Sequence, residues 1–271
     1  MVMYRQNTII DDIVYRIINN DEPCFDFKKI EVNDEIPSTH RIWIVKKKED
    51  IEHLSKAFES VQSIYIADGH HRTAAACKIA SANTSNPNKH SMYIMAMLFP
   101  HSQLSLVPFN RYIKSIDIPI STFLERVSNS FNITEEQEYC EEDSTSSSSS
   151  IRMYVDGKWF VLEKLEAVEI NVNDPMSSID SQILCDHLFK PALGIVSPCL
   201  DSRIGYISGS GSSSMTKLSE LVDSGEATVA FAIRSVSVED VMKVADSGML
   251  LPPKASCFYP KPLKGLVVRL H

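Results

Sequence analysis

Apolar residues recur along the first third of the chain with two alternating periods. Between residues 7 and 19 they stand three and four positions apart, which predicts an amphipathic helix. A short apolar run at 41–46 predicts a strand, and helical spacing returns at 49–60. A second strand is expected at 63–67, followed by an alanine-rich helix over 73–82.

The same alternation continues beyond a polar segment. Residues 83–90 have the composition of a loop, while 91–99 and 104–108 predict two more strands. Strands that alternate with helices must bury their apolar faces against one another, which is typical of a layered α/β domain. We therefore expect the α/β class with a mixed sheet, of the kind also described as α+β.

The second half of the chain contains a hairpin signal and further alternating elements. Strand-like runs within 152–162 are joined by Asp156-Gly157, a dipeptide that supplies the positive φ angles of a tight hairpin turn. Residues 178–189 predict a helix. Helix, strand and helix are then expected in turn at 215–223, 227–233 and 238–246.

A change of composition suggests how the chain is divided. Residues 135–150 are acidic and then almost purely serine, so they cannot bury apolar area and are expected to form a mobile loop or linker. We expect a first part over 1–115 and a second α/β subdomain over 116–271.

Composition excludes several classes of protein. The chain is 44% apolar with a formal net charge of −8, which fits a globular protein whose surface repels nucleic acid backbones. Its six cysteines stand singly and form neither a disulfide framework nor a zinc motif, and Cys77 is expected in the core. Without an apolar leader or an apolar stretch of 18 residues, no membrane partner is expected, and the predicted location is cytoplasmic.

The segment Asp68-Gly69-His70-His71-Arg72 carries the most informative chemistry. It stands between a predicted strand and a predicted helix, where the first helical N–H groups lack partners and carry partial positive charge. A phosphate would satisfy them, glycine permits its close approach, and arginine and histidine add donors. The alternative is a plain turn with a helix cap and two surface histidines.

Several long motifs resemble the family called "domain of unknown function 1015". The family's segments are matched here in the same order, over nearly all of the chain. The matching segments are Tyr65 to Arg72, Val107 to Lys114, Met153 to Trp159, Asp201 to Ile204, and Leu251 to Lys261. The family normally has a further N-terminal region with a His-Glu-x-Thr/Arg motif, so we expect this chain to be a truncated or fragmentary member.

The turn also resembles those of the ParB/sulfiredoxin group, in which some members with Asp-Gly-His-His-Arg are kinases of free serine. The resemblance implies a ParB/sulfiredoxin-like first part, ATP or ADP as phosphoryl donor, and Mg²⁺, with Asp68 as a metal ligand. It implies a catalytic set of Asp68, His70 and His71. The implied nucleotide- or phosphate-binding residues are Gly69, His71, Arg72, Thr73, Arg111 and Lys254.

A general base for the acceptor hydroxyl has no recognisable motif. Glu31 and Asp34 lie upstream of the turn, but both also fit a solvated acidic loop. Lys254 and Lys261 follow prolines that could hold them rigidly, or are plain surface charges. Arg111 and Arg203 could bind phosphate, or could equally have a structural role, because the apolar stem of an arginine packs well.

Four functions follow in decreasing order of support. The first is a nucleotide-dependent kinase of a small molecule such as free serine, and the second is a nucleotide- or phosphate-binding module without catalysis. A role with DNA is disfavoured by the net charge of −8. Hydrolase or nuclease activity has no support in the residues.

Overall fold

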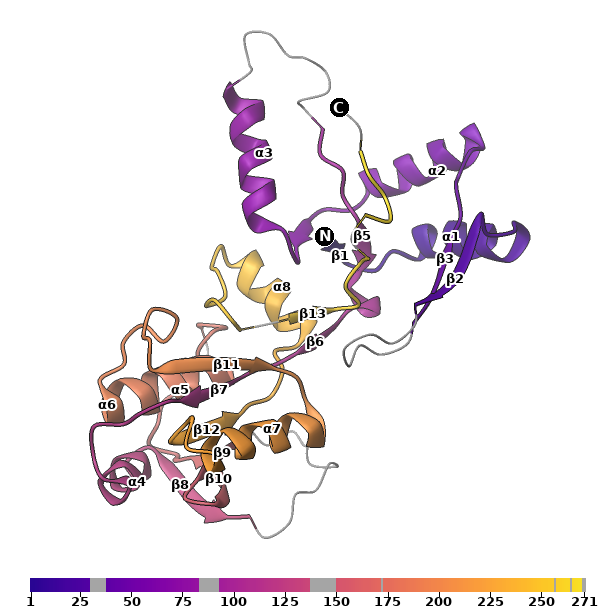
Figure 1. Cartoon of the computed structure of the whole chain (residues 1–271). Coiled ribbons are helices and arrows are strands. Elements are labelled where there is room, and N and C mark those ends of the chain that lie inside the picture. Colours follow the sequence, from indigo (N-terminus) through magenta and orange to yellow (C-terminus); the bar gives the residue numbers. More distant parts are fainter. Residues whose placement is uncertain are drawn as a thin grey trace. The chain divides into compact units, whose positions relative to one another are not determined.

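The computed structural model describes residues 1–29, 38–82, 93–136, 150–171, 173–255, 257–263 and 265–269 (Figure 1). The chain folds into two compact units. Unit 1 comprises residues 1–103 together with 267–271, and unit 2 comprises residues 104–266. The mixed α/β class is confirmed in both units. Within the described residues, no helix has the length and apolar character needed to cross a membrane.

Unit 1 contains a three-stranded mixed sheet in the order β4-β1-β5. The central strand β1 (Val2–Tyr4) pairs antiparallel with β4 (Ile64–Ile66) and parallel with β5 (Leu98–Pro100). A separate antiparallel pair joins β2 (Phe25–Lys29) to β3 (Ser38–Ile42). The first residues of the chain thus occupy the middle of the sheet.

Two helices pack together on one face of β1. In α1 (Thr8–Asn20), the Asn7 side chain caps the helix by accepting from the amides of Ile9 and Ile10. Helix α2 (Lys48–Glu59) packs beside it. The shared core includes Tyr4, Ile10 and Ala57, with the Tyr4 and Phe58 rings edge to face at 5.2 Å.

Unit 2 is built on a six-stranded antiparallel sheet with the order β11-β7-β12-β9-β10-β8. Asp156 and Gly157, both with positive φ, join β9 to β10 as predicted. A two-stranded pair, β6 with β13, completes the strands. Their bounds are β6 (Ser105–Val107), β7 (Phe109–Ile113), β8 (Phe131–Glu135), β9 (Ser150–Val155), β10 (Lys158–Lys164), β11 (Ile204–Ser208), β12 (Val229–Ala232) and β13 (Cys257–Tyr259).

Alternation along these strands divides the side chains between two cores. On one face, residues such as Ile113, Met153 and Phe231 pack with α4 (Ile120–Ser128) and with a helical run made of α5 (Asp180–Leu184), a π-helical segment (Cys185–Phe189) and α6 (Lys190–Leu193). On the other face, Tyr154 and Ala230 pack against Leu218 of α7 (Gly211–Asp223). Helix α8 (Val238–Asp246) follows β12.

The structure corrects several expected elements. The strand expected at 41–46 ends at Ile42, and the one expected at 91–99 is confined to β5. Cys77 is exposed instead of buried, because α3 (His70–Ala82) has no buried residue. The units divide after Gln103, not near residue 115, because β7 pairs with β11 and β12. The segments expected as loops at 83–90 and 135–150 lie outside the described residues, apart from the ends of the latter.

Candidate functional site: a glycine turn at the start of a helix

The Asp68-to-Arg72 turn is anchored to the first strand of unit 1. The amides of Ala67 and Asp68 both donate to the Met1 carbonyl oxygen, each at 3.1 Å. The amino nitrogen of Met1 donates in return to the carbonyl oxygen of Asp68 at 3.1 Å. These bonds fix the point at which the chain leaves β4, so the turn projects from a rigid base.

Gly69 is the residue at which the chain changes from turn to helix. Its φ of +89° lies in the left-handed region that favours glycine. Its carbonyl oxygen accepts from the amide of Thr73 at 3.0 Å and from Thr73 Oγ1 at 3.1 Å. Gly69 therefore occupies the cap position, and α3 begins at His70, slightly earlier than expected. A glycine cap has no side chain with which to satisfy the next amides.

The first turn of α3 concentrates positive charge. Helical N–H groups at this end have no partner in the helix, and among the described residues none of those of His70, His71 and Arg72 has an acceptor. Acidic residues would be favoured there by the helix dipole, yet the first turn has none. His70, His71 and Arg72 are all exposed. Such an arrangement suits an anion that supplies the missing negative charge.

Arg72 lies directly over the glycine. A Cβ atom built on Gly69 would stand 3.2 Å from Arg72 Nη2 and 3.5 Å from its Nε. The guanidinium therefore folds back towards the N-terminal end of its own helix, beside the amides that lack acceptors. Backbone and side-chain donors converge on one exposed spot.

Asp68 precedes this spot, and its carboxylate is exposed. In the part of the chain that is described, no three His, Cys, Asp or Glu side chains are close enough to hold a metal ion among themselves. Magnesium, however, is commonly held by one or two carboxylates together with substrate phosphates. Asp68 could therefore hold a magnesium ion only together with the phosphate oxygens of a ligand.

Two of the predicted site residues lie in unit 2 and contact each other. Arg111 comes from β7, and its Nη2 donates to the Lys254 carbonyl oxygen at 3.3 Å. Arg111 is 3% exposed, whereas Lys254 is exposed. Sequence reasoning did not identify Tyr206, whose ring lies 5.7 Å from the Arg111 guanidinium carbon. Glu31 and Asp34, the candidate bases, lie outside the described residues.

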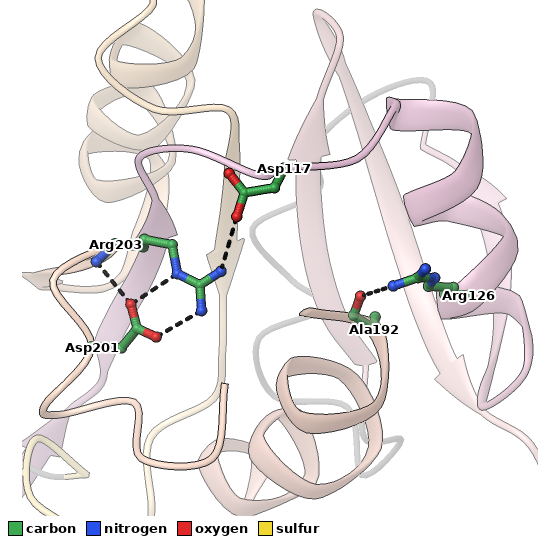
Figure 2. A network of polar contacts seen from close by, with 5 residues as sticks. All are labelled: Asp117, Arg126, Ala192, Asp201 and Arg203. Atoms are coloured by element: carbon green, nitrogen blue, oxygen red, sulfur yellow. Dashed lines mark hydrogen bonds and ion pairs between the residues drawn. The ribbon is translucent and has the colours of Figure 1, made fainter. Parts of the chain in front are cut away.

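Arg203 has a structural role instead. Its Nε and Nη2 donate to the two carboxylate oxygens of Asp201 at 3.0 and 2.7 Å, and Asp117 lies 3.8 Å from Nη1 (Figure 2). The hydrogen bonds from Arg203 hold the pKa of Asp201 below its ordinary value. Arg203 thus joins the loop before β11 to the loop after β7. Arg126 of α4 similarly donates to the Ala192 carbonyl oxygen at the end of α6.

Fold and turn together define a mixed α/β protein that presents an exposed, positively charged helix start. The chain belongs to the family described as "Protein of unknown function (DUF1015)", whose model matches residues 1–182. A search of curated proteins gave no match.

Solved structures match this chain at low similarity. A conserved hypothetical protein from Pyrococcus furiosus is 13% identical, with a TM-score of 0.39, covering 94% of this chain and 85% of that one. A free serine kinase in complex with AMP is 14% identical, with a TM-score of 0.39, covering 95% and 83%. A mutant free serine kinase in complex with ADP is 13% identical, with a TM-score of 0.38, covering 94% and 82%.

Proposed function

We propose that the turn at Gly69 to Thr73 binds the phosphates of ATP or ADP, and that the protein transfers a phosphoryl group to a small hydroxyl compound such as free serine. The observation that carries this proposal is the first turn of α3. It combines amides without acceptors, two histidines and an arginine, and contains no acidic residue. The choice of adenine nucleotide and serine follows from the resemblance of Asp-Gly-His-His-Arg to the turns of free serine kinases.

Each residue of the turn has a part in this proposal. The helix amides and Arg72 bind the phosphate oxygens, and Gly69 allows the phosphate to approach the backbone closely. As the acceptor oxygen bonds to the transferred phosphorus, the bond from phosphorus to the leaving nucleotide oxygen breaks. Arg72 with His70 or His71 then stabilises the charge on the equatorial oxygens. Thr73 holds the Gly69 carbonyl and so fixes the turn.

Asp68 has two compatible parts in the reaction. It can take the proton that the acceptor hydroxyl loses, or it can hold a phosphate-bound Mg²⁺. That ion, when bound, would neutralise charge on the nucleotide phosphates. The Asp68 carboxylate is negative and would repel the phosphate oxygens. In this proposal it therefore faces the metal ion or the acceptor hydroxyl.

A binding module without catalysis is the alternative. Among the described residues, Asp68 is the one acid between Ala67 and Thr73. A kinase that uses Asp68 to hold magnesium therefore needs another residue as the general base. A module that only binds phosphate needs none. Detection of phosphoserine separates the two functions, because both predict nucleotide binding.

The first test is calorimetric titration of the purified chain with ATP and ADP in the presence of Mg²⁺. We expect dissociation constants in the micromolar range, which correspond to a binding free energy of roughly −8 kcal/mol. Arg72→Ala should weaken binding by roughly ten- to a hundredfold, because it removes a charge-assisted contact.

Lys78→Ala is the matched control, because Lys78 is an exposed cation further along the same helix. If Lys78→Ala weakens binding as much as Arg72→Ala, the effect is one of general charge and the turn is not the site. Nucleotide-dependent formation of phosphoserine from serine would then establish catalysis. Binding without product supports the module, and no binding by folded protein contradicts both functions.

A further inference from the structure

Two free cysteines of unit 2, Cys185 and Cys199, are brought together by a turn. Cys185 begins the π-helical segment, and its Sγ lies 3.9 Å from the Val196 carbonyl oxygen. The next residue, Ser197, accepts at its carbonyl oxygen from the amide of Leu200 at 3.0 Å. The ends of such a turn are less than about 7 Å apart. Cys199, within the turn, therefore stays close to the place where Cys185 meets the loop.

The two thiols differ in exposure and act on each other electrostatically. Burial raises the pKa of Cys185, and negative charge on Asp186 and on Cys199 acts in the same direction. Cys185 is half-buried, whereas Cys199 is exposed. A reagent in solution therefore meets Cys199 first, while Cys185 remains the less accessible thiol and keeps its proton longer.

The groups around Cys199 favour a reactive sulfur. The Tyr206 hydroxyl donates to Cys199 Sγ at 3.6 Å, and burial raises the pKa of Tyr206, so this donor keeps its proton. The Tyr206 ring lies 5.7 Å from the guanidinium carbon of Arg111, a buried cation. A hydrogen-bond donor and a nearby cation both stabilise a thiolate, the form of cysteine that attacks a disulfide.

We propose that Cys199 and Cys185 are a redox-active pair, which a small-molecule disulfide oxidises to an intramolecular disulfide. The Cys199 thiolate attacks one sulfur of the small molecule, forming a mixed disulfide and releasing the other half as a thiolate. Cys185 then loses its proton, and its sulfur attacks the Cys199 sulfur. The bond between the two cysteines forms as the bond from Cys199 to the small molecule breaks. Two protein thiols are oxidised, and one small disulfide is reduced to two thiols.

Oxidation changes the contacts of the loop before β11. In the reduced form the Cys199 thiol donates to the Pro253 carbonyl oxygen at 3.2 Å, and the disulfide has no proton to donate. The new bond instead joins the loop covalently to the π-helical segment. A thiol reductant reverses the reaction. The pair shares no residue with the turn at Gly69 to Thr73, so it does not depend on the nucleotide proposal.

The test treats the folded full chain with oxidised glutathione as the small-molecule disulfide. Remaining thiols are alkylated, and the chain is cut by a protease that cleaves before aspartate, because a cut at Asp186 leaves Cys185 and Cys199 on different peptides. We expect mass spectrometry to find these two peptides joined by a disulfide, and a dithiol reductant to separate them. Cys185→Ser should instead accumulate glutathione on Cys199, because the second attack can no longer occur.

Cys77→Ser is the matched control, because Cys77 is an exposed cysteine on α3 of unit 1. It should leave the joined peptides unchanged. The proposal is overturned if the folded wild type gives no joined peptides, or if they form only after the protein is unfolded in urea. It is also overturned if Cys185→Ser carries no glutathione on Cys199. If Cys185→Ser does not fold, Cys185→Ala takes its place.

Discussion

The guanidinium of Arg72 lies over Gly69, so that a Cβ atom on the glycine would stand 3.2 Å from Arg72 Nη2. The two residues therefore depend on each other. The glycine leaves the space that the arginine occupies, and its φ of +89° starts the helix that carries the arginine. The backbone conformation of Gly69 therefore also determines where the charge of Arg72 lies.

Gly69→Ala is expected to disturb both the backbone conformation of the turn and the position of the Arg72 side chain. A left-handed conformation costs a non-glycine residue about 1–2 kcal/mol, and the new methyl group displaces the Arg72 side chain. We expect nucleotide affinity to fall roughly tenfold, measured by calorimetry, together with a small loss of unfolding free energy. Gly248→Ala is the control, because φ there is +74° but a Cβ atom would have nothing within 4 Å. Equal nucleotide affinity in Gly69→Ala and the wild type would contradict the placement of the ligand.

Gly205→Ala tests the packing of the unit 2 sheet. The Tyr112 ring on the neighbouring strand covers Gly205, and a Cβ atom would approach Tyr112 Cζ to 2.0 Å. We expect a loss of about 1–3 kcal/mol in the free energy of unfolding by denaturant, because the ring must leave its position. In a Tyr112→Ala background the same substitution should cost much less. Additive costs would show that the ring does not depend on this glycine.

The ion pair of Asp201 and Arg203 predicts a pH dependence of stability. The pKa of Asp201 is lowered in the folded state, chiefly by its hydrogen bonds from Arg203. Its contribution is therefore fully present above the unfolded pKa of about 3.9 and is lost as pH falls through the folded pKa. Asp201→Asn should be less stable than the wild type from about pH 5 to about pH 8, and the difference should shrink on further acidification.

Denaturant unfolding at several pH values measures this difference directly. Asp12→Asn provides the control, since Asp12 is exposed on α1 and makes no ion pair within the described residues. The control should follow the wild type across the range. A difference between Asp201→Asn and the wild type that stayed constant down to about pH 2 would show that the pair does not act through ionisation.

Long amphipathic helices could be predicted from the chain alone. The helices expected at 7–19, 49–60 and 238–246 are confirmed as α1, α2 and α8 within a residue or two, because each repeats its apolar face over several turns. The hairpin at Asp156-Gly157 is confirmed for a similar reason, since the turn chemistry is local.

Short or polar strands could not be predicted in this way. Strand β1 has three residues, too few to show a period. Strand β7 contains Asn110 and Arg111, which are buried yet polar and so interrupt the expected alternation. Asn110 is satisfied by partners such as Ser214 and the Ile233 amide, more than 100 positions away. Tertiary partners, not local pattern, make these residues acceptable in the sheet.

The predicted site residues of the two units differ in the same respect. The turn of unit 1 is contiguous, so residue type and order identify Gly69 to Thr73 without a structure. The contact of Arg111 with Lys254 joins residues 143 positions apart. Their spacing carries no signal, and the contact of Arg111 with the Tyr206 ring becomes visible only in the structure.

Unit 1 draws residues from both ends of the chain, whereas unit 2 is a single continuous stretch. Residues 267–269 belong to unit 1 but follow the whole of unit 2 in the chain, so a ribosome releases them only after every residue of unit 2 has emerged. Unit 2 can therefore fold during translation while unit 1 still lacks its final residues. We expect newly made chains to pass through a stage in which the six-stranded sheet of unit 2 is folded and the completion of unit 1 awaits residues 267–269.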